Sequence, residues 1–171
     1  MGVKNKRGQI LGLPFQLIFS IILIVVFIYV AVIAIKSILQ TGEQLKAANF
    51  VSDFRNDLEK SMATTESSVT QKYSLPSGIK YLCFTPNANG MKVNSTYFPE
   101  LANYKLQQGK YVFFYPPSYS EKTKIPAYAK VDCENSCLQL AGKNPYCIAV
   151  NNGIASITII KEIGNPYVTI K

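Results

Sequence analysis

The stretch from Gly8 to Ile35 constrains this chain more than any other feature. It reads GQILGLPFQLIFSIILIVVFIYVAVIAI, has 28 residues and carries no charged side chain. A helix needs about 20 apolar residues to cross a bilayer. Because lipid offers no hydrogen-bonding partners, the backbone of such a segment satisfies its own polar groups by forming a helix. The stretch therefore predicts a transmembrane helix over residues 9–39, and its length disfavours the alternative of a buried core helix in a soluble protein.

The charges on either side of this helix predict its orientation. Lys4, Lys6 and Arg7 precede the apolar stretch, and Lys36 follows it. By the positive-inside rule the N-terminus stays cytoplasmic and the C-terminal domain is extracellular. The alternative is a secretory signal peptide that is removed, but its apolar region would be only about 7–15 residues long. The sequence favours a retained anchor in membrane lipid.

The N-terminus KNKRGQI runs without a spacer into the apolar helix. This arrangement resembles the class III signal peptide of archaeal type IV pilin-like proteins. In that family a prepilin peptidase cuts after the glycine that ends the basic stretch, and the apolar helix stays with the mature subunit. The resemblance implies a processing site between Gly8 and Gln9, with Lys4, Lys6 and Arg7 as the recognised charges.

The resemblance covers the N-terminal region only, and it has further implications. It implies self-association through the N-terminal helix, a pilus assembly machinery as partner, and a cell-surface filament used for adhesion. The chain departs from the family at two places. The polar or acidic residues that usually follow the Gln are replaced by Leu11-Gly12-Leu13-Pro14. Many pilins carry Glu at the fifth mature position, which is Leu13 here.

After the apolar stretch, the spacing of apolar residues predicts an amphipathic helix over residues 41–62. Its stripe recurs every three or four positions and consists of Ala47, Phe50, Phe54, Leu58 and Met62. Thr41-Gly42-Glu43-Gln44 resembles a capping box, which would allow a bend at Gly42. The polar stretch Thr64–Gln71 is predicted to be a connection. As an alternative, the stripe would serve a stalk helix or a dimeric coiled coil.

The remainder of the chain predicts short strands rich in β-branched and aromatic residues. They are Ile79–Phe84, Tyr111–Tyr115, Tyr146–Val150, Ile154–Lys161 and Tyr167–Ile170. Turns at 151–153 and 164–166 would join the last three as an antiparallel meander. The strand at Tyr111–Tyr115 is apolar on both faces, which is typical of a central strand; the alternative is an aromatic platform for carbohydrate.

These elements predict an α+β fold, in which one long N-terminal helix packs on an antiparallel, disulfide-bonded β-sheet head with one short helix. Its parts would be a basic leader at 1–8, a transmembrane helix at 9–39, an amphipathic helix with a connection at 40–71, and an extracellular head at 72–171.

Four cysteines lie in the head, and an even number outside the cell predicts two disulfides. Asp132 can cap a short helix over Cys133–Ala141, on which Cys133 and Cys137 share a face. We expect the pairs Cys133–Cys137 and Cys83–Cys147, with the other pairings open. The alternative is a zinc site, for which all four ligands would be cysteines because the chain has no histidine.

The composition argues against catalysis. Without histidine the chain lacks the commonest general base and metal ligand, and its ten carboxylates are scattered. No glycine-rich phosphate loop or nucleophile elbow occurs. We therefore expect no enzyme, cofactor or metal. Asn94 begins an N-glycosylation sequon, Asn94-Ser95-Thr96, consistent with a surface loop of an exported domain.

The charge balance bears on partners. The formal net charge is +8, of which about half belongs to the flanks of the anchor, since fourteen basic and ten acidic residues follow residue 42. A mild surplus fits an anionic surface or a glycan, or simple solubility. Nucleic acid is disfavoured because the basic residues are spread singly. Three functions remain: a filament subunit, a solitary anchored binding domain, and a minor pilin that binds DNA.

Overall fold

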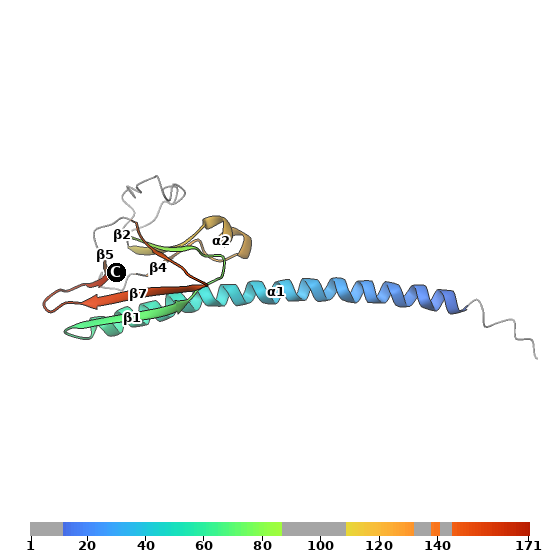
Figure 1. The fold of residues 1–171 in the computed structure, drawn as a ribbon, viewed down its shortest axis with the longest axis horizontal. Coiled ribbons are helices and arrows are strands. Elements are labelled where there is room, and N and C mark those ends of the chain that lie inside the picture. Colours follow the sequence, from blue (N-terminus) through green and yellow to red (C-terminus); the bar gives the residue numbers. More distant parts are fainter. Residues whose placement is uncertain (1–11, 87–108, 132–137, 141–144) are drawn as a thin grey trace, which may run out of the picture. The chain divides into compact units, whose positions relative to one another are not determined.

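The computed structural model describes residues 12–86, 109–131, 138–140 and 145–171, with side chains from Phe15 onward. Within these residues the chain forms two helices and eight strands, in the order α1, β1, β2, β3, α2, β4, β5, β6, β7, β8 (Figure 1). The chain divides into two compact units, Met1–Thr41 and Gly42–Lys171, and helix α1 (Gly12–Met62) contributes to both. The second unit is the β-rich head.

The part of α1 in the head carries the predicted apolar stripe. Ala47, Phe50, Phe54 and Leu58 are buried, and Met62 is partly buried against the same core. The stripe exists because residues three and four apart lie on one face of a helix. The amphipathic interpretation of this segment is confirmed.

The capping box predicted at the start of this segment does not form, because α1 continues through Gly42 without interruption. The Thr41 hydroxyl donates instead to the carbonyl oxygen of Ser37 one turn earlier, at 3.0 Å. Gln44 Nε2 donates to the carbonyl oxygen of Thr123, at 3.0 Å. A long-range contact therefore uses the side chain that the sequence assigned to a local cap.

The strands of the head form two four-stranded sheets in place of the single antiparallel sheet that the sequence predicted. The first sheet has the order β1 (Ser67–Ser74), β7 (Ile154–Lys161), β8 (Val168–Ile170), β5 (Leu138–Leu140). The second has the order β4 (Tyr128–Lys130), β3 (Lys110–Tyr115), β2 (Tyr81–Pro86), β6 (Tyr146–Ala149). All described pairs are antiparallel except β5 with β8, which is parallel.

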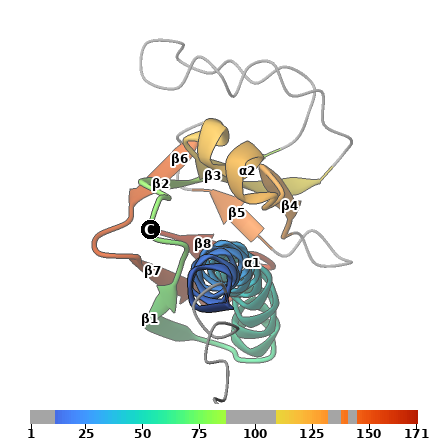
Figure 2. The same ribbon diagram turned by 90° about the vertical axis from the view of Figure 1, so that its right-hand side faces the viewer.

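One hydrophobic core joins α1 to both sheets. Figure 2 shows the ribbons of these elements, with α1 viewed along its axis. The ring of Phe54 lies 5.8 Å from that of Tyr73 on β1 and 5.3 Å from that of Phe84 on β2. The ring of Phe50 lies 6.0 Å from that of Phe114 on β3. Aromatic side chains bury more area than other residues, so these rings dominate the stability of the head.

Strand β3 is interior in its sheet and is buried on both faces, as predicted. Its side chains Val112 and Phe114 belong to the core against α1. On the opposite face the rings of Tyr111 and Phe113 pack against Tyr128 of β4, at 5.9 and 5.5 Å. Because Phe113 is 0% exposed and Tyr111 7% exposed, these two rings take part in packing.

The predicted three-stranded C-terminal meander is correct for its last two strands, because β7 and β8 pair antiparallel. It is wrong for the first, because β6 and β7 belong to different sheets. The turn at 151–153 does form, and Asn151 and Ile154 exchange two backbone hydrogen bonds of 2.9 Å. Strand β6 then pairs with β2, and β7 pairs with β1 and β8. A turn fixes the reversal of the chain, whereas the available partner strands decide which sheet each arm joins.

Strand β1 occupies most of the stretch that the sequence assigned to a polar connection. Its pattern is polar because it is an edge strand whose only buried residue is Tyr73. The Tyr73 hydroxyl donates to a carboxylate oxygen of Asp57 on α1, at 2.8 Å, and Thr70 shares a 2.9 Å hydrogen bond with its cross-strand partner Thr158. Backbone pairing with β7, rather than apolar alternation, maintains this strand.

The short helix predicted over Cys133–Ala141 is wrong where the structure describes it. Residues Leu138–Leu140 form β5, and Leu138 is buried in the core. Residues 132–137 and 141 lie outside the described residues. The second helix is instead α2 (Pro117–Thr123), which the sequence analysis missed. It begins with Pro117, a residue suited to the first turn of a helix because it has no N–H to leave unpaired.

The disulfide Cys83–Cys147 is confirmed. It joins residues that lie directly opposite each other on β2 and β6, with their Cα atoms 4.0 Å apart. Cys133 and Cys137 lie outside the described residues, so their pairing stays a prediction. The bond closes a loop of 64 residues and thereby restricts the unfolded chain.

Replacing Phe54 with Ala tests the core. We expect the free energy of unfolding of the head to fall by about 3–5 kcal/mol, because the substitution removes a fully buried ring and leaves a cavity. Urea unfolding of the full chain in detergent, followed by near-ultraviolet circular dichroism, measures this loss. The matched control is Phe27→Ala, whose ring is 70% exposed in the first unit and should affect the head little. Equal losses in both variants would contradict the assignment.

Removing the disulfide tests its contribution. The double variant Cys83→Ala/Cys147→Ala should lose about 4 kcal/mol of unfolding free energy, because the unfolded chain regains the entropy of a 64-residue loop. The single variant Cys83→Ala breaks the same bond and should lose a similar amount. The same urea titration reports both, and a double variant as stable as the wild type would refute this account.

Candidate functional site

The apolar part of α1 in the first unit is the candidate functional surface. From Phe15 to Leu39 every residue is exposed, and the large apolar side chains in this range have between 40% and 74% of their surface accessible. The described part of this helix is long and apolar enough to cross a membrane, and none of its most apolar window is buried. This exposure distinguishes it from the core helix of a soluble protein, in which the apolar side chains are buried.

Two hydroxyl groups in this part of α1 are satisfied within the helix. The Ser20 hydroxyl donates to the carbonyl oxygen of Gln16 at 2.9 Å, and the Thr41 hydroxyl makes the equivalent bond to Ser37. A hydroxyl that donates to the carbonyl four residues earlier needs no partner from outside the helix. These residues can therefore enter lipid, or face apolar neighbours, without an unpaired donor.

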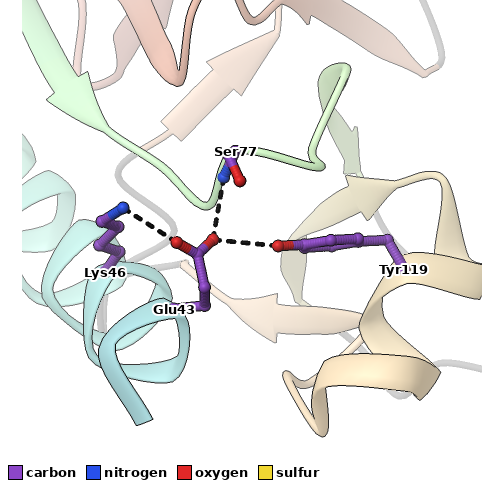
Figure 3. A network of polar contacts seen from close by, with 4 residues as sticks. All are labelled: Glu43, Lys46, Ser77 and Tyr119. Atoms are coloured by element: carbon purple, nitrogen blue, oxygen red, sulfur yellow. Dashed lines mark hydrogen bonds and ion pairs between the residues drawn. The ribbon is translucent and has the colours of Figure 1, made fainter. Parts of the chain in front are cut away.

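A cluster of polar contacts marks the point where α1 enters the head (Figure 3). One oxygen of Glu43, Oε2, accepts hydrogen bonds from the backbone N–H of Ser77 at 2.9 Å and from the hydroxyl of Tyr119 at 3.0 Å. Its other oxygen, Oε1, binds the ammonium of Lys46 at 3.0 Å. A single carboxylate thus links α1 to the segment between β1 and β2 and to α2.

The ring of Tyr119 packs closely on the backbone at Gly78. A Cβ placed on Gly78 would come within 2.1 Å of this ring. Any side chain at position 78 would therefore have to displace Tyr119 and, with it, the hydrogen bond to Glu43. The glycine is required here by close approach, since its φ angle is not among the positive values.

The contacts of Glu43 shift its titration. Partial burial raises the pKa of this carboxyl, but the hydrogen bonds from Lys46, Ser77 and Tyr119 outweigh burial, so that the net pKa lies below its ordinary value. Burial, followed by the hydrogen bond to Glu43, raises the pKa of Tyr119. Glu43 is thus held ionised and Tyr119 protonated, which are the forms that this geometry needs.

Several predicted site residues lie outside the described residues. They are the processing site Gly8 and Gln9, the leader charges Lys4, Lys6 and Arg7, the sequon residue Asn94, and the cysteines Cys133 and Cys137. Among the described residues, no group of three or more His, Cys, Asp or Glu is placed to hold a metal ion.

Sequence reasoning missed Glu43 as a contact residue. It named this residue only within the capping-box sequence, with no role of its own, although Glu43 is the first acidic residue of the chain and follows the apolar stretch closely. That position was a usable signal, because a carboxylate that becomes partly buried costs free energy unless it is partnered. Its partners Ser77 and Tyr119 were not predictable, because they are 34 and 76 residues away.

Comparisons with family models, curated proteins and solved structures find no match to this chain. The class of protein therefore rests on the fold and on the exposed helix: an α+β head that continues, through α1, into an apolar helix able to cross a membrane.

Replacing Glu43 with Gln tests the polar cluster. At pH 7 we expect a loss of about 1–2 kcal/mol of unfolding free energy, because charge-assisted hydrogen bonds become neutral ones. The folded pKa is depressed, so the stabilisation is complete above the ordinary carboxyl pKa, 4.5, and is lost as the pH falls below it through the folded pKa.

The difference between wild type and Glu43→Gln should therefore shrink when urea unfolding is repeated between pH 7 and pH 3. The control is Glu59→Gln, an exposed acidic residue on the same helix, which should change stability by less than about 0.5 kcal/mol. A Glu43→Gln effect that stays constant over this pH range would contradict the assigned contacts.

Proposed function

We propose that this chain is a type IV pilin-like structural subunit of a cell-surface filament, used for adhesion or surface contact. The observation that carries the proposal is α1 itself. Its first part exposes an uncharged apolar surface from Phe15 to Ile35, and its second part provides the central stripe of the head's core. Exposed apolar surface on this scale needs lipid or other apolar helices to cover it.

The same helix would act both before and during filament assembly. Before assembly it holds the subunit in membrane lipid, with the N-terminus cytoplasmic and the head outside. During assembly, lipid around Leu, Ile, Val and Phe side chains is replaced by the helices of neighbouring subunits. Because lipid tails are about as apolar as leucine, this exchange depends on packing between helices rather than on the hydrophobic effect.

The head suits an exposed position. The disulfide Cys83–Cys147 covalently ties β2 to β6, and such bonds persist in oxidising surroundings outside the cell. The N-terminal KNKRGQI sequence adds the resemblance to a class III leader, with a processing site at Gly8 and Gln9. Together these features favour a filament subunit.

One feature favours a second candidate, a solitary membrane-anchored binding domain that does not polymerise. Leu13 stands where many pilins carry the Glu that sets the register between subunits. A chain without this charge would stay in lipid as a single anchor. The two candidates differ in whether the leader is removed and whether the chain enters filaments.

Blocking the processing site separates them. In the native cell, Gly8→Val should leave the chain at full length, in the membrane and absent from surface filaments, because the resemblance places the cut directly after this glycine. The matched control is Gly2→Val, which lies outside the expected site and should be processed normally. Intact-mass spectrometry of the membrane and filament fractions provides the measurement.

For the wild type and Gly2→Val we expect filaments built from a chain that begins at Gln9. A wild-type chain that keeps residues 1–8 and never appears in filaments would refute the pilin proposal and leave the solitary anchor in its place.

A further inference from the structure

We propose that Asn152 is a modification site, at which the side-chain amide is lost by spontaneous deamidation and at which the fold of the head controls the reaction. The chemistry needs only water and the backbone nitrogen of Gly153, so it requires no enzyme. The proposal concerns one turn of the head and is independent of whether the chain forms filaments.

The sequence at this turn favours the reaction. Asn152 is followed by Gly153, and the chain has one other Asn-Gly pair, at Asn89 and Gly90. Asparagine is one of the thermolabile residues. Glycine has no Cβ, so its backbone nitrogen is less shielded than that of any other residue that can follow an asparagine. Asn152 is also exposed, so water reaches its amide.

Deamidation proceeds through a cyclic imide. The backbone nitrogen of Gly153 loses its proton to a solvent base and attacks Cγ of Asn152. The bond between this nitrogen and Cγ forms, the bond from Cγ to the amide nitrogen breaks, and the amide nitrogen takes up a proton and leaves as ammonia. Water then opens the ring at either carbonyl carbon. One product is aspartate, and the other is isoaspartate, in which the backbone continues through the side-chain carbons.

The conformation of the turn opposes ring closure. Asn152 and Gly153 both have positive φ angles, +51° and +73°, as in a type I′ turn. In such a turn ψ of the first central residue is about +30°, by mirror symmetry with a type I turn. The ring requires the Gly153 nitrogen to eclipse Cβ of Asn152, whereas this ψ angle places the nitrogen on the far side of the Cα–C bond from Cβ. The closed turn therefore keeps the reacting atoms apart.

Backbone hydrogen bonds hold the turn closed. Asn151 and Ile154 each donate their N–H to the other's carbonyl oxygen, at 2.9 Å. The N–H of Leu75 donates to the carbonyl oxygen of Gly153 at 2.8 Å, and a Cβ on Gly153 would lie 3.1 Å from the carbonyl oxygen of Leu75. Rotation about ψ of Asn152 moves Gly153 and breaks these contacts. The ring therefore forms only in heads whose turn has opened.

The isoaspartate product prevents the turn from closing again. It lengthens the backbone by one carbon atom within a two-residue loop, so the paired hydrogen bonds of Asn151 and Ile154 no longer form in register. The turn joins β6 in one sheet to β7 in the other. A head that has opened and reacted in this way keeps a permanent defect between its sheets, and Asn152 records the opening chemically.

The deamidation rates of the folded and the unfolded chain test the proposal. The full chain in detergent is incubated at neutral pH, either in buffer or in urea above its unfolding midpoint, and its peptides are analysed over time by mass spectrometry. We expect Asn152 to react at least about tenfold more slowly in buffer, because the turn is open for only a small fraction of the time. In urea Asn152 and Asn89 should react at similar rates, since both precede glycine.

Two variants test whether opening of the turn controls the rate. In Cys83→Ala/Cys147→Ala, β6 is no longer tied to β2, and Asn152 should react severalfold faster in buffer than it does in the wild type. Phe27→Ala alters an exposed ring of the first unit and should leave the rate unchanged. Exchange of the Ile154 amide proton with deuterium measures the opening independently and should rise with the deamidation rate.

Three outcomes would overturn the proposal. Equal rates at Asn152 in buffer and in urea would show that the turn exerts no control. A chain in which Asn89 reacts in urea and Asn152 does not would show that Asn152 is not a site. Faster exchange at Ile154 in the double cysteine variant, without faster deamidation, would separate the reaction from the opening of the turn.

Discussion

The head depends on the burial of one face of α1. Ala47, Phe50, Phe54 and Leu58 place a stripe of apolar surface in the core, and both sheets contribute side chains that cover it. Without this helix the two sheets would each expose an apolar face, since their buried residues belong to a single cluster with α1. The helix is therefore an internal part of the domain and not an appendage to it.

This arrangement gives α1 two different environments within one uninterrupted element. Up to Leu39 its side chains are exposed, and from Ala47 one face is buried in protein. The change takes place over about two turns, where Glu43 and Gln44 bind Ser77, Tyr119 and Thr123. Hydrogen bonds at this boundary stabilise the carboxylate of Glu43, because a partly buried charge without partners costs free energy.

Long-range constraints decide the organisation of the strands. The disulfide Cys83–Cys147 joins β6 to β2, while the turn at 151–153 sends the following strand β7 to β1 in the other sheet. Neighbours in the sequence thus separate, and residues 64 positions apart are covalently joined. The head obtains stability from connections across the domain, which local sequence patterns do not encode.

The sequence by itself determined the elements whose side chains carry a strong periodic signal. The uncharged run from Gly8 to Ile35 predicted an apolar helix, and the spacing of Phe50, Phe54 and Leu58 predicted its amphipathic continuation. The β-branched residues of Ile154–Lys161 predicted strand β7, whose burial alternates along most of its length. Each signal is local, because a residue's place on a helix or strand face follows from its spacing to near neighbours.

Only the tertiary structure decided the rest. Strand β1 is an edge strand with one buried side chain, so its residues gave no apolar pattern, and β5 became a strand because Leu138 enters the core beside β8. The role of Glu43 depends on Tyr119, 76 residues later. Strand partners, sheet membership and the polar cluster are choices between distant segments, and no local preference of the chain distinguishes among them.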